Sequence, residues 1–151
     1  MNQTDIQPLV AAYHRRLSHI DLSFKRYLYT KINWNVRLVG IRGARGVGKT
    51  TLLLQHIKET YKNVDDTLWV SMDNLWFKTH DVDELVEWLY NHGKTTLYFD
   101  EVHKCPDWTL RLKNYYDSLA GWGYCYFVCC SHLRIHTSLI LIRSASKWQK
   151  L

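Results

Sequence analysis

The sequence predicts an α/β fold, in which a parallel sheet is flanked by helices and preceded by an N-terminal helical extension. Two observations predict this class. Short apolar runs alternate with segments of helical periodicity, which is typical of a parallel sheet covered by helices. A glycine-rich stretch, GARGVGKTT at 43–51, lies between an apolar run and a leucine-rich run, where a strand–loop–helix unit would place it.

Length and composition narrow the class of protein further. The chain of 151 residues is long enough for one buried core. No apolar run approaches the ~20 residues that span a membrane, and the first ten residues lack the pattern of a secretory signal. We therefore expect a cytoplasmic protein with no membrane partner. The net charge of +6 leaves nucleic acid open as a partner, with a solvated basic surface as the simpler explanation.

The N-terminal half contains three predicted elements. Residues 5–30 carry apolar side chains at helical spacing, and Asp21 and Ser23 can divide this segment into two helices. The β-branched run at 35–41 predicts a strand that ends near a glycine. The leucine-rich segment at 50–61 predicts a helix that buries its leucines.

Alternation of strand and helix continues in the C-terminal half. The helix at 81–93 is the clearest, because Asp81 can cap it and Glu84 follows three residues later, as in a capping box. The run at 95–101 is apolar enough for a strand buried on both faces. The other predicted elements are a strand at 67–73, a helix at 107–121 and a strand at 124–130. We expect a helical extension at 1–34, a core at 35–131 and a divergent tail at 132–151.

Residues 43–50 fit the phosphate-loop pattern G-x4-G-K-[ST], which makes the predicted fold P-loop NTPase-like. Glycines allow consecutive backbone N–H groups to converge on a phosphate, and the following helix directs its positive end at the same anion. The Lys49 ammonium can reach the β- and γ-phosphates, and the Thr50 hydroxyl can ligate Mg2+. The predicted nucleotide-binding residues are Gly43, Ala44, Arg45, Gly46, Val47, Gly48, Lys49, Thr50 and Thr51.

Two carboxylates, Asp100 and Glu101, end the predicted strand at 95–101. Ligands bind at the carboxyl ends of strands in a parallel sheet, so Asp100 can hold Mg2+ and Glu101 can activate a water molecule. The alternative is that both carboxylates only cap the turn before Pro106. Adjacent acids suit hydrolysis better than transfer to a metabolite, so a small P-loop kinase is the lesser alternative.

Several ordered segments resemble a known family. RLVGIRGARGVGKTTLLLQ, VSMD, LYFDEVHKCPDW and LKNYYD are together similar to the prokaryotic AAA-type ATPases with AAA domain 14, usually followed by a DUF4143 region. The resemblance implies a P-loop ATPase of the additional-strand class with ATP as ligand and Mg2+ as cofactor. It implies Lys49 and Thr50 on the phosphates and metal, Asp100 on Mg2+ and Glu101 as the catalytic base. Lys49 would also assist catalysis.

The resemblance fails after residue 123, where acidic residues also disappear from the sequence. The family's γ-phosphate sensor has only Ser131 as a candidate. Our hypothesis is a truncated or frame-shifted member of the family. This leaves a non-catalytic nucleotide-binding remnant or interaction module as the alternative function, and it leaves self-association or an unknown protein partner open.

Other features favour simpler interpretations. Arg42 and Arg45 flank the loop and are expected to be solvated or to stabilise the fold. The alternative is that one of them contacts nucleotide or the site of a neighbouring subunit. His103 is expected to be a surface or turn histidine. The basic segment 14–26 is expected to be a solvated helix face, with contact to nucleic acid or a partner helix as the alternative. The cysteines and histidines at Cys125, Cys129, Cys130, His132 and His136 match no standard zinc spacing.

Overall fold

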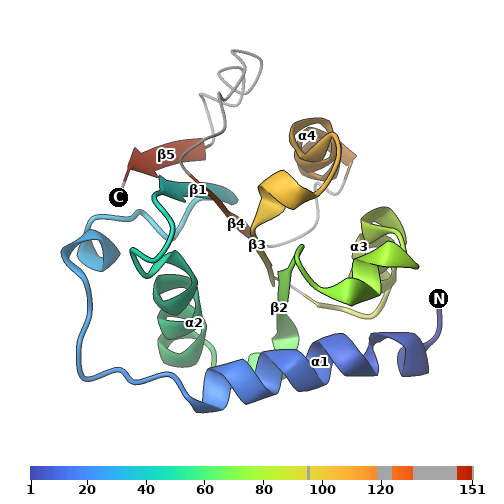
Figure 1. Ribbon diagram of the computed structural model, residues 1–151, viewed down its shortest axis with the longest axis horizontal. Coiled ribbons are helices and arrows are strands. Elements are labelled where there is room, and N and C mark those ends of the chain that lie inside the picture. Colours follow the sequence, from blue (N-terminus) through green and yellow to red (C-terminus); the bar gives the residue numbers. More distant parts are fainter. Residues whose placement is uncertain (95, 119–123, 131–145, 151) are drawn as a thin grey trace.

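The sheet has five parallel strands with helices on both faces (Figure 1). The computed structural model describes residues 1–94, 96–118, 124–130 and 146–150. The strands are β1 (Leu38–Gly43), β2 (Thr67–Ser71), β3 (Thr96–Asp100), β4 (Tyr124–Cys130) and β5 (Ser146–Lys150). The longer helices are α1 (Gln3–Ser18), α2 (Lys49–Thr60), α3 (Val82–Asn91) and α4 (Trp108–Ser118). Short 3-10 helices are η1 (Tyr27–Thr30), η2 (Val64–Asp66), η3 (Leu75–Lys78) and η4 (Val102–Lys104).

The strand order is β2-β3-β4-β1-β5. Strand β4 therefore lies between β1, which leads into the phosphate loop, and β3, which ends at the acidic pair. Its pairing is parallel on both sides, with Phe127 opposite Gly40 on β1 and opposite Phe99 on β3.

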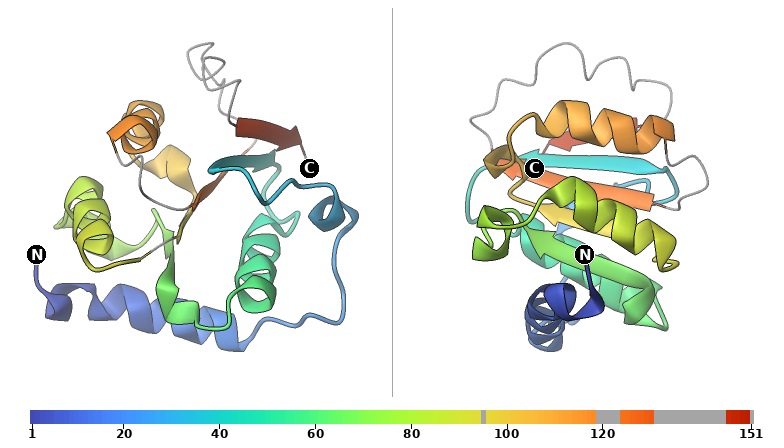
Figure 2. Two further views of the ribbon diagram at one scale, coloured as in Figure 1. Left: turned by 180° about the vertical axis from the view of Figure 1, so that it is seen from behind. Right: turned by 90° about the vertical axis from the view of Figure 1, so that its right-hand side faces the viewer.

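The helices form two layers. Helix α2 covers one face of the sheet, and α3 and α4 cover the other (Figures 1 and 2). Helix α1 crosses β2 at the edge of the sheet (Figure 2), where the Tyr13 hydroxyl is 2.7 Å from the Thr67 hydroxyl. Leucines of α2 and α3 are almost fully buried against the sheet, which fits their apolar spacing.

The N-terminal segment differs from a continuous helix over 5–30. Helix α1 ends at Ser18, and the chain runs without a further α-helix to η1. The backbone N–H of Ser23 donates to the Asp21 carboxylate at 2.8 Å. Such a local side-chain contact competes with helical hydrogen bonds, so the helix is interrupted in this region as predicted. The second predicted helix is wrong, because only the four-residue η1 forms in its place.

Two further differences concern strands. The strand predicted at 35–41 is β1 at Leu38–Gly43, because residues 34–37 form turns and Arg42 and Gly43 pair with β4. Within the segment predicted as a tail, residues 146–150 pair in parallel with β1. The proposed domain division stays a prediction.

Candidate functional site

The loop between β1 and α2 has the backbone that its glycines predict. Gly46 and Gly48 have φ values of 80° and 86°, a left-handed region that L side chains rarely adopt. Gly48 is the N-cap of α2, so the free N–H groups and positive end of this helix begin at the loop. This is the geometry of an anion-binding site.

Lys49 is buried inside this loop, with only 5% of its surface exposed. Its ammonium donates to the carbonyl oxygens of Gly43 at 2.9 Å and Ala44 at 2.7 Å. The positive charge is therefore held between the two arms of the loop, where it adds to the positive end of α2.

Asp100 lies next to the first turn of α2. It is the last residue of β3 and is 3% exposed. The Thr50 hydroxyl donates to its carboxylate at 2.5 Å, and the N–H of Glu101 donates to it at 2.9 Å. Burial raises the pKa of Asp100 above its usual value, and the hydrogen bond from Thr50 opposes this effect.

The contact between Thr50 and Asp100 has the chemistry of a magnesium site. A hydroxyl oxygen and a carboxylate are both hard oxygen donors of the kind that Mg2+ prefers. They come from residues that are 50 positions apart and meet beside the phosphate loop. The donor set therefore fits the metal that the sequence predicts.

Glu101 begins the turn after β3 and has a left-handed backbone, with φ of 53°. A non-glycine residue in this region costs roughly 1–3 kcal/mol, a cost often found at functional sites. One carboxylate oxygen of Glu101 lies 3.3 Å from Nε2 of His103. The turn thus brings an acid and an imidazole together at the carboxyl edge of the sheet.

Sequence reasoning favoured a turn or surface role for His103. The structure places it in η4, as expected for a turn, but also against Glu101. Its Nδ1 is buried and has no hydrogen-bond partner within the described part of the chain. A histidine two residues after a candidate base was the only signal in the sequence for this contact.

The arginines around the loop differ in their exposure and in their contacts. Arg45 is exposed, and Arg42 is half-buried in β1. Arg26 belongs to the basic segment 14–26, which is expected to be a solvated helix face, but it lies against Gly48. A Cβ built on Gly48 would be 2.6 Å from Nε of Arg26. No local pattern could have indicated this contact, because the two residues are far apart in sequence.

Several residues that the sequence singles out lie outside the part of the chain that the structure describes. Ser131, His132 and His136 fall outside the described residues, as do the side chains of Cys125, Cys129 and Cys130. Among the described residues, no group of three or more histidine, cysteine or acidic side chains is placed to hold a metal ion. Over the same residues, no helix has the length and apolar character needed to cross a membrane.

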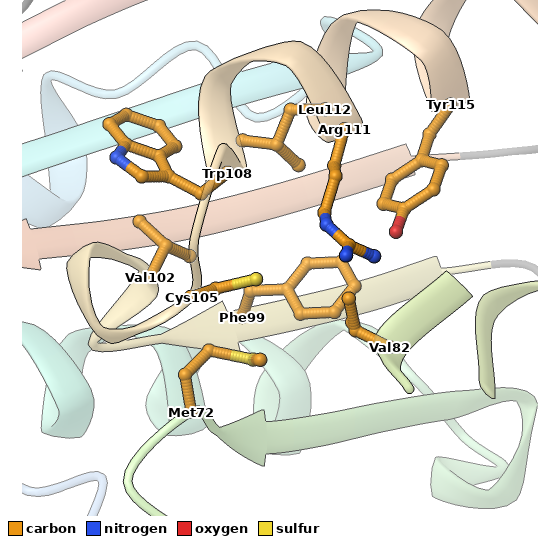
Figure 3. Close-up of a pocket in the computed structure, with 9 residues that line it drawn as sticks. All are labelled: Met72, Val82, Phe99, Val102, Cys105, Trp108, Arg111, Leu112 and Tyr115. Carbon is orange, nitrogen blue, oxygen red and sulfur yellow. The ribbon is translucent and has the colours of Figure 1, made fainter. Parts of the chain in front are cut away.

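A small apolar cavity lies between β3 and α4 (Figure 3). Its volume is about 20 Å³, close to the space that one water molecule needs. Phe99, Cys105 and Leu112 line it, and Arg111 and Tyr115 lie at its side. Its lining includes no residue of the phosphate loop, so it is not the nucleotide site.

Comparison with known proteins gives a family match. A family model described as an AAA domain matches residues 35–137, which is more than half of the chain. The matched range begins at the turn before β1 and continues past residue 123. No curated protein matches the chain significantly.

Solved structures match over nearly the whole chain at low identity. One described as a DNA replication initiation factor is 12% identical, with 100% of this chain and 47% of that chain covered and a TM-score of 0.52. PCH-2 from C. elegans is 16% identical, with 97% and 41% covered and a TM-score of 0.47. AMPPCP-bound DnaA from Aquifex aeolicus is 13% identical, with 99% and 47% covered and a TM-score of 0.46. The chain spans less than half the length of these proteins, and the first match confirms the predicted fold class.

Proposed function

The chain belongs to the AAA domain family, and we propose that it binds ATP with Mg2+ and hydrolyses it by attack of an activated water molecule. The family match supports a nucleotide-binding, ATPase-type function. The observation that carries the finer proposal is the 2.5 Å contact between Thr50 and Asp100 beside the phosphate loop. It joins a loop that can hold phosphates to an acid that can hold a metal.

Each residue of the site has a separate task in this proposal. The amides at 43–51 bind the phosphates, and the Lys49 ammonium moves from its loop carbonyls to the β- and γ-phosphates. Thr50 and Asp100 would hold Mg2+, which supplies neutralisation of phosphate charge when bound. These contacts position the nucleotide and stabilise the charge that develops during transfer.

Glu101 is the proposed base. Its carboxylate follows Asp100 at the edge of the sheet, and His103 at 3.3 Å orients it. In the reaction, Glu101 accepts a proton from water as the oxygen forms a bond to the γ-phosphorus. The bond from that phosphorus to the β–γ bridging oxygen breaks, and ADP and inorganic phosphate leave.

The test measures ATP binding and phosphate release on the wild type, Lys49→Ala and Glu101→Gln. We expect Lys49→Ala to weaken ATP binding by roughly 10- to 150-fold, since a charge-assisted phosphate contact contributes about 1.5–3 kcal/mol. We expect Glu101→Gln to bind ATP and release no phosphate. Equal phosphate release from all three proteins would refute hydrolysis at this site.

Two other results would point to the alternative functions. ATP binding by the wild type without phosphate release above that of Glu101→Gln would indicate a non-catalytic binding module. Transfer of phosphate to an added small-molecule acceptor, in place of release to water, would indicate a kinase.

A further inference from the structure

The guanidinium of Arg26 lies over the end of the phosphate loop. A Cβ built on Gly48 would be 2.6 Å from Nε of Arg26 and 3.2 Å from both Cζ and Nη2. All three atoms belong to the charged, planar end of the side chain. The contact is therefore between the guanidinium and the residue that caps α2.

Side chains of α2 hydrogen-bond to the segment that carries Arg26. The buried amide of Gln55 donates to the carbonyls of Asp21 at 2.8 Å and Phe24 at 2.7 Å. Lys58 donates to the carbonyl of Ile20 at 2.7 Å. Because these anchors belong to the helix that begins at the phosphate loop, they hold the backbone of the segment that carries Arg26 near that loop.

The positive charges around Arg26 favour the binding of an anion. Within the described residues, no carboxylate lies within ion-pair distance of its guanidinium, whereas the neighbouring Lys25 pairs with Glu59. Arg26 faces the positive end of α2, and the Lys49 ammonium lies in the same loop. Asp100 is the nearby carboxylate that acts on Lys49, whereas Arg26 has no such partner at ion-pair distance among the described residues. A bound phosphate would supply the negative charge that Arg26 and the positive end of α2 favour.

We propose that Arg26 binds the α- and β-phosphates of the nucleotide, as a binding residue supplied by the segment that follows α1. This inference rests on the proposed function. The amides at the start of a P-loop helix cradle the α- and β-phosphates, while the loop lysine reaches the β- and γ-phosphates. Arg26 lies at that helix start, and its planar donors suit phosphate oxygens. It therefore recognises the part shared by ATP and ADP.

The test is isothermal titration of Mg-ATP and Mg-ADP into four proteins: the wild type, Arg26→Ala, Arg26→Lys and Lys31→Ala. We expect Arg26→Ala to weaken the binding of both nucleotides by about 10-fold or more. Arg26→Lys keeps the charge but not the planar fork, so its loss should be smaller. Lys31→Ala is the control, because Lys31 is a cation of the same segment that lies over the Tyr27 ring. Its binding should match that of the wild type.

Each other outcome has a defined meaning. Unchanged or tighter binding by Arg26→Ala overturns the inference, and a loss confined to Mg-ATP overturns it in favour of a γ-phosphate contact. A loss of equal size in Lys31→Ala also overturns it, because general charge would then explain the effect. Failure of the wild type to bind either nucleotide refutes the proposed function itself. Arg26 is exposed, so thermal unfolding of the variants should match that of the wild type.

Discussion

Replacing Asp100 with asparagine distinguishes two roles of this residue: binding Mg2+ and stabilising the turn after β3. Asp100 is buried, and it accepts hydrogen bonds from the Thr50 hydroxyl and the Glu101 N–H. Asparagine keeps one side-chain oxygen, so it can keep one of these bonds. A neutral hydrogen bond contributes about 0.5–1.5 kcal/mol, and removal of a buried charge offsets part of that loss. We expect the unfolding free energy without nucleotide to change by about 1 kcal/mol or less.

The response to ligand should change much more. At a free nucleotide concentration 100 times Kd, binding stabilises a protein by about 2.7 kcal/mol. For a domain of this size, that corresponds to a rise in Tm of roughly 5–10 °C. In the wild type, Mg2+ should contribute a large part of this rise. In Asp100→Asn, the rise with ATP should be the same with Mg2+ as with a chelator.

The assay is thermal unfolding by circular dichroism with no ligand, with ATP and chelator, and with ATP and Mg2+. Asp73→Asn is the matched control, since Asp73 follows β2 at the same edge and is 4.0 Å from the Lys104 ammonium. It removes an equal charge from an exposed position and should respond as the wild type does. A full Mg2+-dependent rise in Asp100→Asn would show that our reasoning about the metal site is wrong.

Two further predictions concern histidines. His56 is buried, stacks on Trp34 and lies 2.8 Å from the Tyr98 hydroxyl; burial lowers its pKa to about 4. In the folded protein His56 stays neutral, whereas in the unfolded chain it binds a proton below about pH 6.5. Acid therefore favours the unfolded state, and the free energy of unfolding should fall by about 3 kcal/mol from pH 7 to pH 4. Urea unfolding at several pH values measures this change. In His56→Gln the free energy of unfolding should depend less on pH, and an equal pH dependence in both proteins would contradict the assignment to His56. His103→Ala should release phosphate about 10-fold more slowly with unchanged ATP affinity, and His103→Gln should recover part of the rate. Wild-type turnover in His103→Ala would remove its orienting role.

The sequence by itself determined the local elements and the phosphate loop. Strand β4 spans 124–130 as predicted, and the helix predicted at 81–93 is α3 at Val82–Asn91. These follow from apolar spacing, caps and glycines, which act over a few residues. Asp81 caps α3 by accepting from the N–H of Asp83. Gly46 and Gly48 take positive φ values for the same local reason.

Only the tertiary structure decided which distant residues meet. Hydrogen bonds between strands do not depend on their order in the chain, so local patterns left open the insertion of β4 between β1 and β3 and the addition of β5 beside β1. Packing of α2 against the sheet brings Thr50 to Asp100, and anchoring of the preceding segment on α2 brings Arg26 to Gly48. Such contacts depend on the summed packing of many side chains, a property that no local spacing encodes.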